Sequence, residues 1–317
     1  MVTMVPSNTE AHYIPPVNEK DTGVISVDEN MQFTEKQKKS IEQQYEKNKK
    51  KTLEKFESLS SFPEIAEFLN SQIRNTVFQI TDHTRVNDTH RTLLIPRSKR
   101  QELAIVLEKA EVYDAATFFP EINTSAIFFG QAEEKIMSKG RKPLLTIEKA
   151  LHEYAHSLCS SEILFDKEQG QKAKVSVERH GFKQNALASA DELIPKIGKT
   201  LEELHAYCVQ SFGITTIAEL NRSKDPDFEY HSVYDRRREA ARNVLHTLAS
   251  KSGVSEKKLI KLMTEAKVDP RKNEQRLRTL IEANGRDGLY DLLLTFDFNQ
   301  TGEQSIVGTF NKLAETI

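Results

Sequence analysis

The sequence lacks the features that would define several classes of protein. Its 317 residues include only two cysteines, Cys159 and Cys208, so a disulfide-stapled fold is excluded. No apolar run approaches the roughly 18 residues that a membrane helix requires. Residues 1–21 also lack a positive region followed by an apolar core, the pattern of a secretory signal. We therefore expect no membrane association and a cytoplasmic location, unless an unconventional export route delivers the chain.

An excess of charge of one sign is also absent. The 45 lysines and arginines nearly balance the 47 aspartates and glutamates, and the formal net charge is -2. This balance gives no global basic field, so we expect no nucleic-acid partner. Hydrophobic residues make up 38% of the chain and charged residues 29%, which is typical of a soluble, helix-rich globular protein.

Composition divides the chain into parts. The N-terminal segment has no apolar periodicity, whereas the stretch from Thr34 to Phe56 is helix-forming and carries eight lysines against four glutamates. This stretch could dock on an acidic partner, or it could be a solvated helix. The expected parts are a disordered tail (1–30), a Lys-rich helical arm (31–60), the main globular domain (61–250) and a C-terminal helical subdomain (251–317).

Hydrophobic periodicity predicts a helix-rich α+β fold. Strands are expected at 91–96 and twice within 115–131, where two apolar runs flank a turn. Helices are expected at 63–80, 99–110, from about 146 onward, and at 200–212, 230–250, 255–266, 273–283 and 286–295. A small sheet before residue 146 and helices after it indicate an α+β domain with a helical C-terminal part.

The stretch KALHEYAHSLCS, residues 149–160, contains His152, Glu153 and His156. On a helix, two histidines four residues apart lie one turn apart on one face, so both imidazoles can reach one metal ion. Glu153 lies beside the ion rather than on it, where it can accept a proton from metal-bound water. The alternative is a pair of histidines satisfied by ordinary hydrogen bonds. Apolar neighbours predict a buried helix, however, in which such side chains would be costly without a cation, and zinc suits the imidazole ligands.

This pattern resembles the zincin superfamily of metallopeptidases. In that superfamily an edge strand precedes the motif helix, and residues 123–131 followed by LLTIEKALHEYAHSL are similar to that arrangement. The resemblance covers roughly residues 90–210. One departure is Lys149, where the extended family pattern has a small or β-branched uncharged residue. The resemblance implies that residues 61–250 form a zincin-like catalytic domain with bound Zn2+ and a peptide or protein substrate.

A catalytic zinc site needs a third protein ligand. The chain resembles the gluzincins, in which a second helix supplies a glutamate followed at the third position by a small residue, and Glu203 with Ala206 fits that pattern. Thr200 and Glu203 also fit a capping box, in which Glu203 would only bond the Thr200 amide. In that case Glu202 is the alternative ligand.

The residues that follow the motif offer further ligands. The metzincin pattern would place glycine at 159 and histidine at 162, but the chain has Cys159 and Glu162, so that subclass is excluded. Glu162 stays open as a ligand, although no glycine turns the helix back towards the metal. Cys159 could bind as a thiolate or could be a small buried apolar residue, and Cys208 has the same apolar interpretation.

Hydrolysis also needs a donor for the developing oxyanion. Tyr234 is the first candidate and His231 the second, with Arg238 one turn after Tyr234 on the same helical face. Tyr234 could equally be a core aromatic residue with a solvated hydroxyl. Arg236 and Arg237 could be solvated or could bind an acidic substrate.

These residues together predict a zinc-dependent metallohydrolase, and within that class a peptidase. His152, His156 and Glu203 would hold the zinc, and Glu153 would act as general base. The alternatives are a zincin-fold binding protein that has lost turnover, and a hydrolase of non-peptide substrates with the same zinc chemistry. An intact Glu153 favours the enzyme, because a structural zinc site does not need it.

Overall fold

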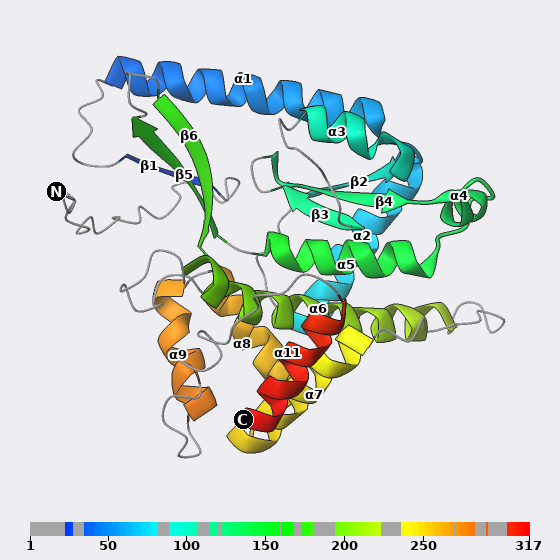
Figure 1. The fold of residues 1–317 in the computed structure, drawn as a ribbon, viewed down its shortest axis with the longest axis vertical. Helices are drawn as coiled ribbons and strands as arrows, with labels where there is room; N and C mark the ends of the chain where they lie inside the picture. Colours follow the sequence, from blue (N-terminus) through cyan, green and yellow to red (C-terminus); the bar gives the residue numbers. More distant parts are fainter. Residues whose placement is uncertain are drawn as a thin grey trace.

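The computed structural model combines many helices with two small sheets (Figure 1). It describes residues 23–27, 35–81, 89–106, 115–119, 122–158, 160–167, 173–180, 194–222, 236–268, 270–282, 290 and 303–317. The helices are α1 (Glu35–Leu59), α2 (Pro63–Thr81), α3 (Arg100–Val106), α4 (Gln131–Met137), α5 (Leu144–Ser157), α6 (Ile194–Arg222), α7 (Arg236–Ser252), α8 (Glu256–Val268), α9 (Pro270–Glu282) and α11 (Glu303–Thr316), with a short 3-10 helix, η1 (Arg97–Lys99). The strands are β1 (Gly23–Val27), β2 (Arg91–Pro96), β3 (Ala116–Phe119), β4 (Thr124–Phe129), β5 (Ser160–Lys167) and β6 (Ala173–His180). The helix-rich α+β class expected from the sequence is confirmed.

The sheet that precedes the motif helix has the strand order β2-β4-β3. β2 runs parallel to β4, and β3 runs antiparallel to β4 with Phe119 opposite Thr124. All six residues of β4 are buried, because this strand has a neighbour on each side and α5 packs against it. We expected residues 123–131 to supply the edge strand, and that expectation is wrong. β4 is central, and β3 is an edge strand among the strands that the structure describes.

A second sheet, with the order β1-β5-β6, was not expected from the sequence. β5 begins shortly after α5 ends, pairs antiparallel with β6, and pairs parallel with β1. β1 belongs to the segment 1–30 that we expected to be a disordered tail, and the rest of that segment lies outside the described residues. Strand formation depends on packing partners more than on local propensity, and the β1 and β5 partners are far apart in the chain.

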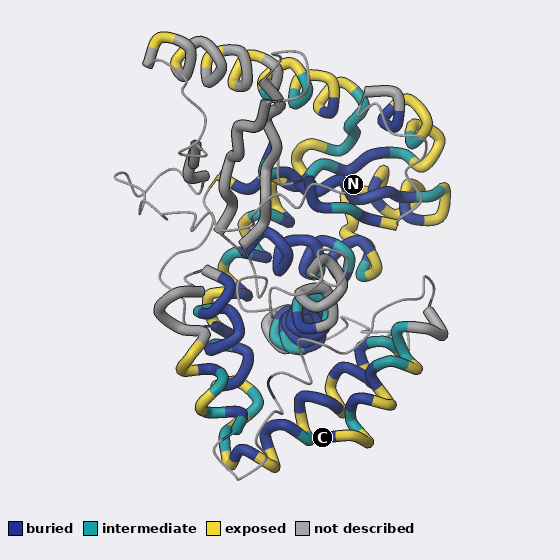
Figure 2. Tube along the Cα trace, turned by 60° about the vertical axis from the view of Figure 1, so that its left-hand side comes forward, coloured by how far each residue is buried: buried dark blue, intermediate teal, exposed yellow. Residues whose placement is uncertain are grey.

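The motif helix α5 lies between the first sheet and the helical half of the molecule (Figure 1). It contacts β3 and β4 on one side and α6 on another, and α6 packs in turn against α2, α7 and α8. Buried side chains of α2, α5, α6, α7, α8 and α11 belong to one hydrophobic core, and Figure 2 shows the buried residues concentrated in that interior. Residues on both sides of the predicted boundary at 250 therefore share this core.

The Lys-rich segment 31–60 contains α1, which contacts α3 and β2. Its described residues are mostly exposed (Figure 2), but Phe56 near its end is fully buried. Phe56 packs edge-to-face on Phe119, with ring centroids 5.0 Å apart, in a smaller core cluster that also contains Ile95 and Phe128. The end of the helix is thus anchored to the first sheet by aromatic packing.

Most of the described helices lie where periodicity predicts them. α6 is longer than expected and begins at Ile194, and α11 was not predicted, although Ile306, Phe310 and Leu313 form an apolar stripe along it. The expected helix at 286–295 lies outside the described residues except for Tyr290.

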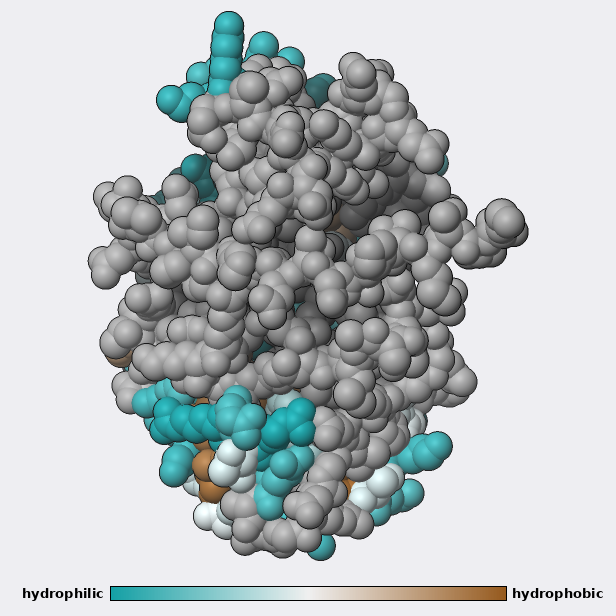
Figure 3. Space-filling model, turned by 90° about the vertical axis from the view of Figure 1, so that its left-hand side faces the viewer, coloured by the Kyte–Doolittle hydropathy of each residue, from teal (hydrophilic) through white to brown (hydrophobic). Residues whose placement is uncertain are grey.

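One face of the helical half is mainly polar where it is described (Figure 3). On the face in Figure 3, the described side chains of this half are mainly hydrophilic, with a few hydrophobic ones between them. None of the described helices is both long and apolar enough to cross a membrane.

Candidate metal centre

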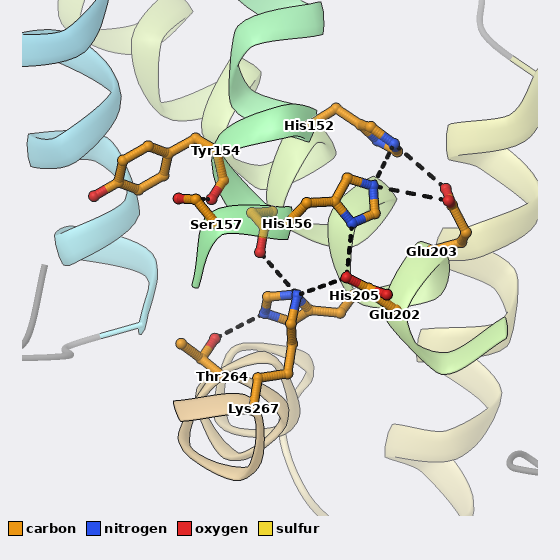
Figure 4. A network of polar contacts seen from close by, with 10 residues as sticks. His152, Tyr154, His156, Ser157, Glu202, Glu203, His205, Thr264 and Lys267 are labelled. Atoms are coloured by element: carbon orange, nitrogen blue, oxygen red, sulfur yellow. Dashed lines mark hydrogen bonds and ion pairs between the residues drawn. The ribbon is translucent and has the colours of Figure 1, made fainter. Parts of the chain in front are cut away.

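The local sequence of α5 fixes which motif side chains share a face. Ala150, Leu151 and Ala155 are fully buried, so the helix turns its apolar residues into the core. His152 and His156 lie one turn apart on another face, which looks towards α6 (Figure 4). The motif histidines are thereby held at the α5–α6 contact.

Lys149, the residue that departs from the zincin pattern, anchors α5 to the sheet. Its Nζ donates to the backbone carbonyl of Phe128 at 3.0 Å and to Glu133 Oε1 at 2.9 Å. Glu133 also accepts from the Gly130 amide at 3.0 Å and from the Thr146 hydroxyl at 3.1 Å. Burial would raise the pKa of Glu133, but the Gly130 amide and the Lys149 ammonium lower it overall. Lys149 therefore joins the motif helix to the end of β4 by a hydrogen bond and to the start of α4 by an ion pair.

The second helix, α6, brings two adjacent carboxylates to the motif. Thr200 lies well inside α6, which begins at Ile194, so Thr200 is not an N-terminal residue and the capping-box alternative for Glu203 is wrong.

Helices α5 and α6 approach each other closely at Gly213, where a Cβ atom would lie 2.8 Å from Leu151 Cδ2. Ala206, the small residue expected after the third ligand, is fully buried.

Three side chains converge at the contact of α5 and α6 (Figure 4). His152 Nε2 lies 3.1 Å from His156 Nε2 and 3.4 Å from Glu203 Oε2, and His156 Nε2 lies 3.8 Å from Glu203 Oε1. One potential ligand atom from each of the three residues lies within 4.8 Å of the others. The structure thus brings together the three residues that the sequence analysis proposed as ligands.

The donor set fits a metal ion. In a tetrahedral site with bonds of about 2.0–2.1 Å, ligand atoms lie about 3.3 Å apart, close to the separations found here. Two neutral imidazoles and one carboxylate also form a ligand set known from catalytic zinc sites with an open fourth position. His152, His156 and Glu203 can therefore hold one divalent cation without rearranging the helices.

The neighbouring charges shift the pKa values of His152 and Glu203 in opposite directions. Burial would lower the pKa of His152, but its hydrogen bond with Glu203 and the charge of Glu153 raise it overall. Burial would likewise raise the pKa of Glu203, yet His156 and His152 lower it to about 2. Glu203 is thus ionised across the physiological range, as a ligand carboxylate must be.

Glu153 is buried beside the three residues rather than among them. Burial raises its pKa, and the charges of His156 and His152 only partly offset this effect. The backbone N–H of Phe118, in the edge strand β3, donates a hydrogen bond to its carboxylate. The motif glutamate therefore sits between the candidate ligands and the edge of the sheet.

Glu202, the alternative ligand, contacts the far side of His156 instead. Its Oε1 lies 3.2 Å from His156 Nδ1 (Figure 4). A carboxylate at Nδ1 fixes the imidazole tautomer, with the proton on Nδ1 and the lone pair on Nε2, which faces Glu203. Glu202 therefore orients His156, and Glu203 is the carboxylate on the Nε2 side of that ring.

His152 is oriented by aromatic packing. Its ring centroid lies 4.5 Å from that of Tyr207, which in turn packs edge-to-face on Phe310 of α11 at 6.0 Å. Nδ1 of His152 is buried and has no hydrogen-bond partner among the described residues. The guanidinium of Arg237 lies 5.8 Å from the Tyr207 ring centroid, so this arginine is near the centre rather than remote from it.

The other predicted site residues either lie outside the described residues or make other contacts. Tyr234 and His231, the oxyanion candidates, lie outside the described residues, as does Cys159. Arg238 is buried and lies 3.1 Å from Glu148 of α5, so it joins α7 to the motif helix. Glu162 is in β5, and its backbone lies opposite that of Glu178 in β6. The structure describes the strand there but not the Glu162 side chain.

Cys208 is buried in α6, as the apolar interpretation of this residue predicted. Burial raises the pKa of its thiol, so it stays protonated at neutral pH. A protonated, buried thiol behaves as a small apolar side chain rather than as a ligand.

Two residues of the site, Lys267 and His205, were missed from the sequence. Both are fully buried, with Lys267 Nζ 3.4 Å from His205 Nδ1 (Figure 4). Burial and the Lys267 charge hold the pKa of His205 well below its ordinary value, so this imidazole is neutral. The position of Lys267 could have indicated its burial from the sequence. It lies seven residues after Ile260, and therefore on the apolar stripe of α8. The helix predicted at 255–266 ends one residue before Lys267.

Comparison of the chain with models of known protein families, with curated proteins and with solved structures gives no significant match.

Proposed function

We propose that this protein is a zinc-dependent hydrolase and that its substrates are peptides. The observation that carries the proposal is the convergence of His152, His156 and Glu203 beside the buried carboxylate of Glu153. A structural zinc site has four protein ligands and no need of an adjacent base. Three candidate ligands with a neighbouring carboxylate favour a catalytic site.

Zinc is the ion that best suits this ligand set. Imidazole nitrogen and carboxylate oxygen are both common zinc ligands, and the expected separations of ligand atoms agree with those observed. When bound, zinc supplies a Lewis acid that lowers the pKa of coordinated water to about 7. The hydrogen bond of Glu202 to His156 supports this assignment, because ligating histidines usually donate their second N–H to such a group.

Glu153 is suited to move the proton. Burial raises its pKa above that of an exposed glutamate, which makes its carboxylate a stronger base towards water. The Phe118 N–H holds the carboxylate in position. In the proposed reaction Glu153 accepts a proton from water and later donates it to the leaving group.

The edge strand favours an extended peptide as substrate. The Phe128 N–H donates to the Ala115 carbonyl, so by antiparallel alternation Ala116 and Phe118 turn their backbone groups away from β4. A peptide that paired with this side of β3 would lie next to Glu153. This arrangement of strand, motif helix and second-helix glutamate supports the gluzincin-like assignment within the zincin superfamily.

The test compares the parent chain, purified without a histidine tag, with the variants Glu153→Gln and His152→Ala. The parent should hold about one zinc ion per chain and hydrolyse members of a peptide library, since three protein ligands define one catalytic site. Glu153→Gln should keep the zinc and lose at least about 100-fold in turnover. His152→Ala should lose both zinc and turnover, and the exposed Glu134→Gln should resemble the parent.

Three outcomes would overturn parts of the proposal. A parent chain that binds no zinc would remove its basis. Zinc binding without hydrolysis would favour a zincin-fold binding protein that recognises partners without turnover. Hydrolysis of ester or small amide substrates alone would favour a non-peptide hydrolase.

A further inference from the structure

Lys267 is the one lysine among the buried residues that the structure describes. It lies near the end of α8, and its side chain has no exposed surface. An ammonium group removed from water is destabilising unless charged or polar groups surround it. The groups around Lys267 therefore indicate what this side chain does.

The ammonium first meets the end of the motif helix. Lys267 Nζ donates a hydrogen bond of 2.8 Å to the backbone carbonyl of Ala155, the residue before His156 (Figure 4). This carbonyl also accepts from the Leu158 N–H at 3.3 Å, in the last turn of α5. The C-terminal end of a helix carries the negative end of the helix dipole, so a cation stabilises it. Lys267 thereby fixes the turn of α5 that carries His156.

The same ammonium also faces the carboxylate that orients His156. Lys267 Nζ lies 4.0 Å from Glu202 Oε1, and that oxygen lies 3.2 Å from His156 Nδ1. One carboxylate oxygen thus lies between an ammonium group and an imidazole N–H. A partly buried negative charge on Glu202 is stabilised from both sides in this arrangement.

The remaining contacts hold Lys267 in one orientation. Its Nζ lies 3.4 Å from His205 Nδ1, and His205 Nε2 lies 2.8 Å from the Thr264 hydroxyl. That hydroxyl donates to the Ile260 carbonyl at 2.9 Å. Lys267 donates to Nδ1 of His205, His205 donates from Nε2 to Thr264, and Thr264 donates to the backbone. These three hydrogen bonds therefore run in one direction, and each has a donor and an acceptor.

We propose that Lys267 is a positioning residue of the metal centre. Through Glu202 and the Ala155 carbonyl it holds His156 with Nε2 turned towards His152 and Glu203. The inference rests on the proposed function only in that the centre must bind zinc. Lys267 contacts the Ala155 carbonyl, His205 and Glu202, and none of these is one of the three candidate ligands of the centre.

The expected effect of removing Lys267 is a loss of zinc affinity. Outer-shell partners of a ligating histidine contribute about 10–100-fold to metal affinity. Lys267 acts through Glu202, one contact further from the ion, so Lys267→Met should weaken zinc binding by about tenfold, the lower end of that range. Met keeps the length of the side chain and removes the charge.

The experiment is a double-variant cycle measured by zinc competition with a chromophoric chelator at pH 7 on the full chain. It uses the parent, Lys267→Met, Glu202→Gln and the double variant, with Lys258→Met as the control because this exposed lysine is on the same helix. Lys267→Met should lose affinity in the parent background and should lose clearly less once Glu202 is already neutral, because only the contact with the Ala155 carbonyl then remains. The absorption spectrum of cobalt-substituted protein gives a second measure of ligand geometry. Circular dichroism monitors folding.

Lys267→Gln serves as a second variant, since its amide can still donate to the Ala155 carbonyl. Zinc affinity and a cobalt spectrum equal to those of the parent in a folded Lys267 variant would overturn the proposal. An equal loss in both backgrounds would do the same, because Lys267 would then act independently of Glu202. Failure of both Lys267 variants to fold would assign the residue to the core and also overturn it. A parent that binds no zinc would overturn the proposed function as well. This outcome can be told apart from a failure of the Lys267 proposal alone, in which the parent binds zinc and the Lys267 variants bind it equally well.

Discussion

Glu202 and Glu203 are adjacent on α6, yet they approach the motif histidines from opposite sides. Glu203 faces the Nε2 atoms of both histidines, at 3.4 Å from His152 and 3.8 Å from His156, whereas Glu202 lies 3.2 Å from Nδ1 of His156. Neighbouring residues of a helix are about 100° apart around its axis. This rotation gives two adjacent carboxylates different roles at one centre, and it makes them separable by substitution.

The first prediction separates these roles. Glu203→Gln should weaken zinc binding by more than about 100-fold, because a neutral amide replaces a ligand, while Glu202→Gln should weaken it by about 10–100-fold as a change in a group that orients a ligand. Zinc titration of folded protein measures both, with Glu162→Gln as a third comparison. Unchanged affinity in Glu203→Gln together with a large loss in Glu202→Gln or Glu162→Gln would move the third ligand to that residue.

The second prediction concerns the anchor of α5. Glu133→Gln should destabilise the protein by up to about 3–5 kcal/mol at pH 7, because it leaves the largely buried Lys149 ammonium without its counter-charge. Urea unfolding measures the change. The exposed neighbour Glu134→Gln should alter stability by less than about 0.5 kcal/mol. Equal effects of the two substitutions would contradict the role given to Glu133.

The same pair predicts a pH dependence. The pKa of Glu133 is lower in the folded protein than its ordinary value of 4.5, so folding is favoured by its ionised form. This contribution is fully present above about pH 4.5 and is lost as the pH falls through the lowered folded pKa. Unfolding measured between pH 7 and pH 3 should therefore show a smaller acid-induced loss of stability in Glu133→Gln than in the parent. An identical acid slope would show that other carboxylates carry the effect.

The fourth prediction concerns the buried ion pair between Glu148 and Arg238, which joins α5 to α7 at 3.1 Å. Glu148→Gln or Arg238→Met alone should cost about 3–5 kcal/mol, because each leaves one buried charge without its partner. The double variant should lose less than the sum of the two. Strictly additive losses in chemical unfolding would mean that the two side chains act independently.

The fifth prediction uses the aromatic support of His152. Phe310→Ala should destabilise the fold by about 3–5 kcal/mol and should also weaken zinc binding by up to about tenfold, since Tyr207 loses its packing partner. Leu313→Ala, which removes another fully buried side chain from α11, should cost about 2–5 kcal/mol with zinc affinity unchanged. Equal zinc affinities of the two variants would limit Phe310 to a role in the core.

Local sequence was sufficient for the features that depend on spacing along one element. His152 and His156 share a face because the helical period is 3.6 residues, and the strand at 91–96 matches β2 because its apolar run is bounded by turn residues. The resemblance to gluzincins, with Ala206 at the third position, pointed to Glu203. The helix that carries Glu203 proved longer than expected, and this length removed the capping-box alternative. The sequence therefore predicted the helix-rich α+β class and the residues that converge at the centre.

Features that join distant segments were decided only by the tertiary structure. Periodicity gives the face on which a residue lies but not the element that the face contacts, so the separate roles of Glu202 and Glu203 appeared only when α6 was seen against α5. Lys267 interrupts the apolar pattern of α8. Its burial is explained only by groups from other helices, the Ala155 carbonyl and Glu202, which stabilise the ammonium. The pairing of β1 with β5 and the central position of β4 likewise depend on partners far away in the chain, which a local pattern does not specify.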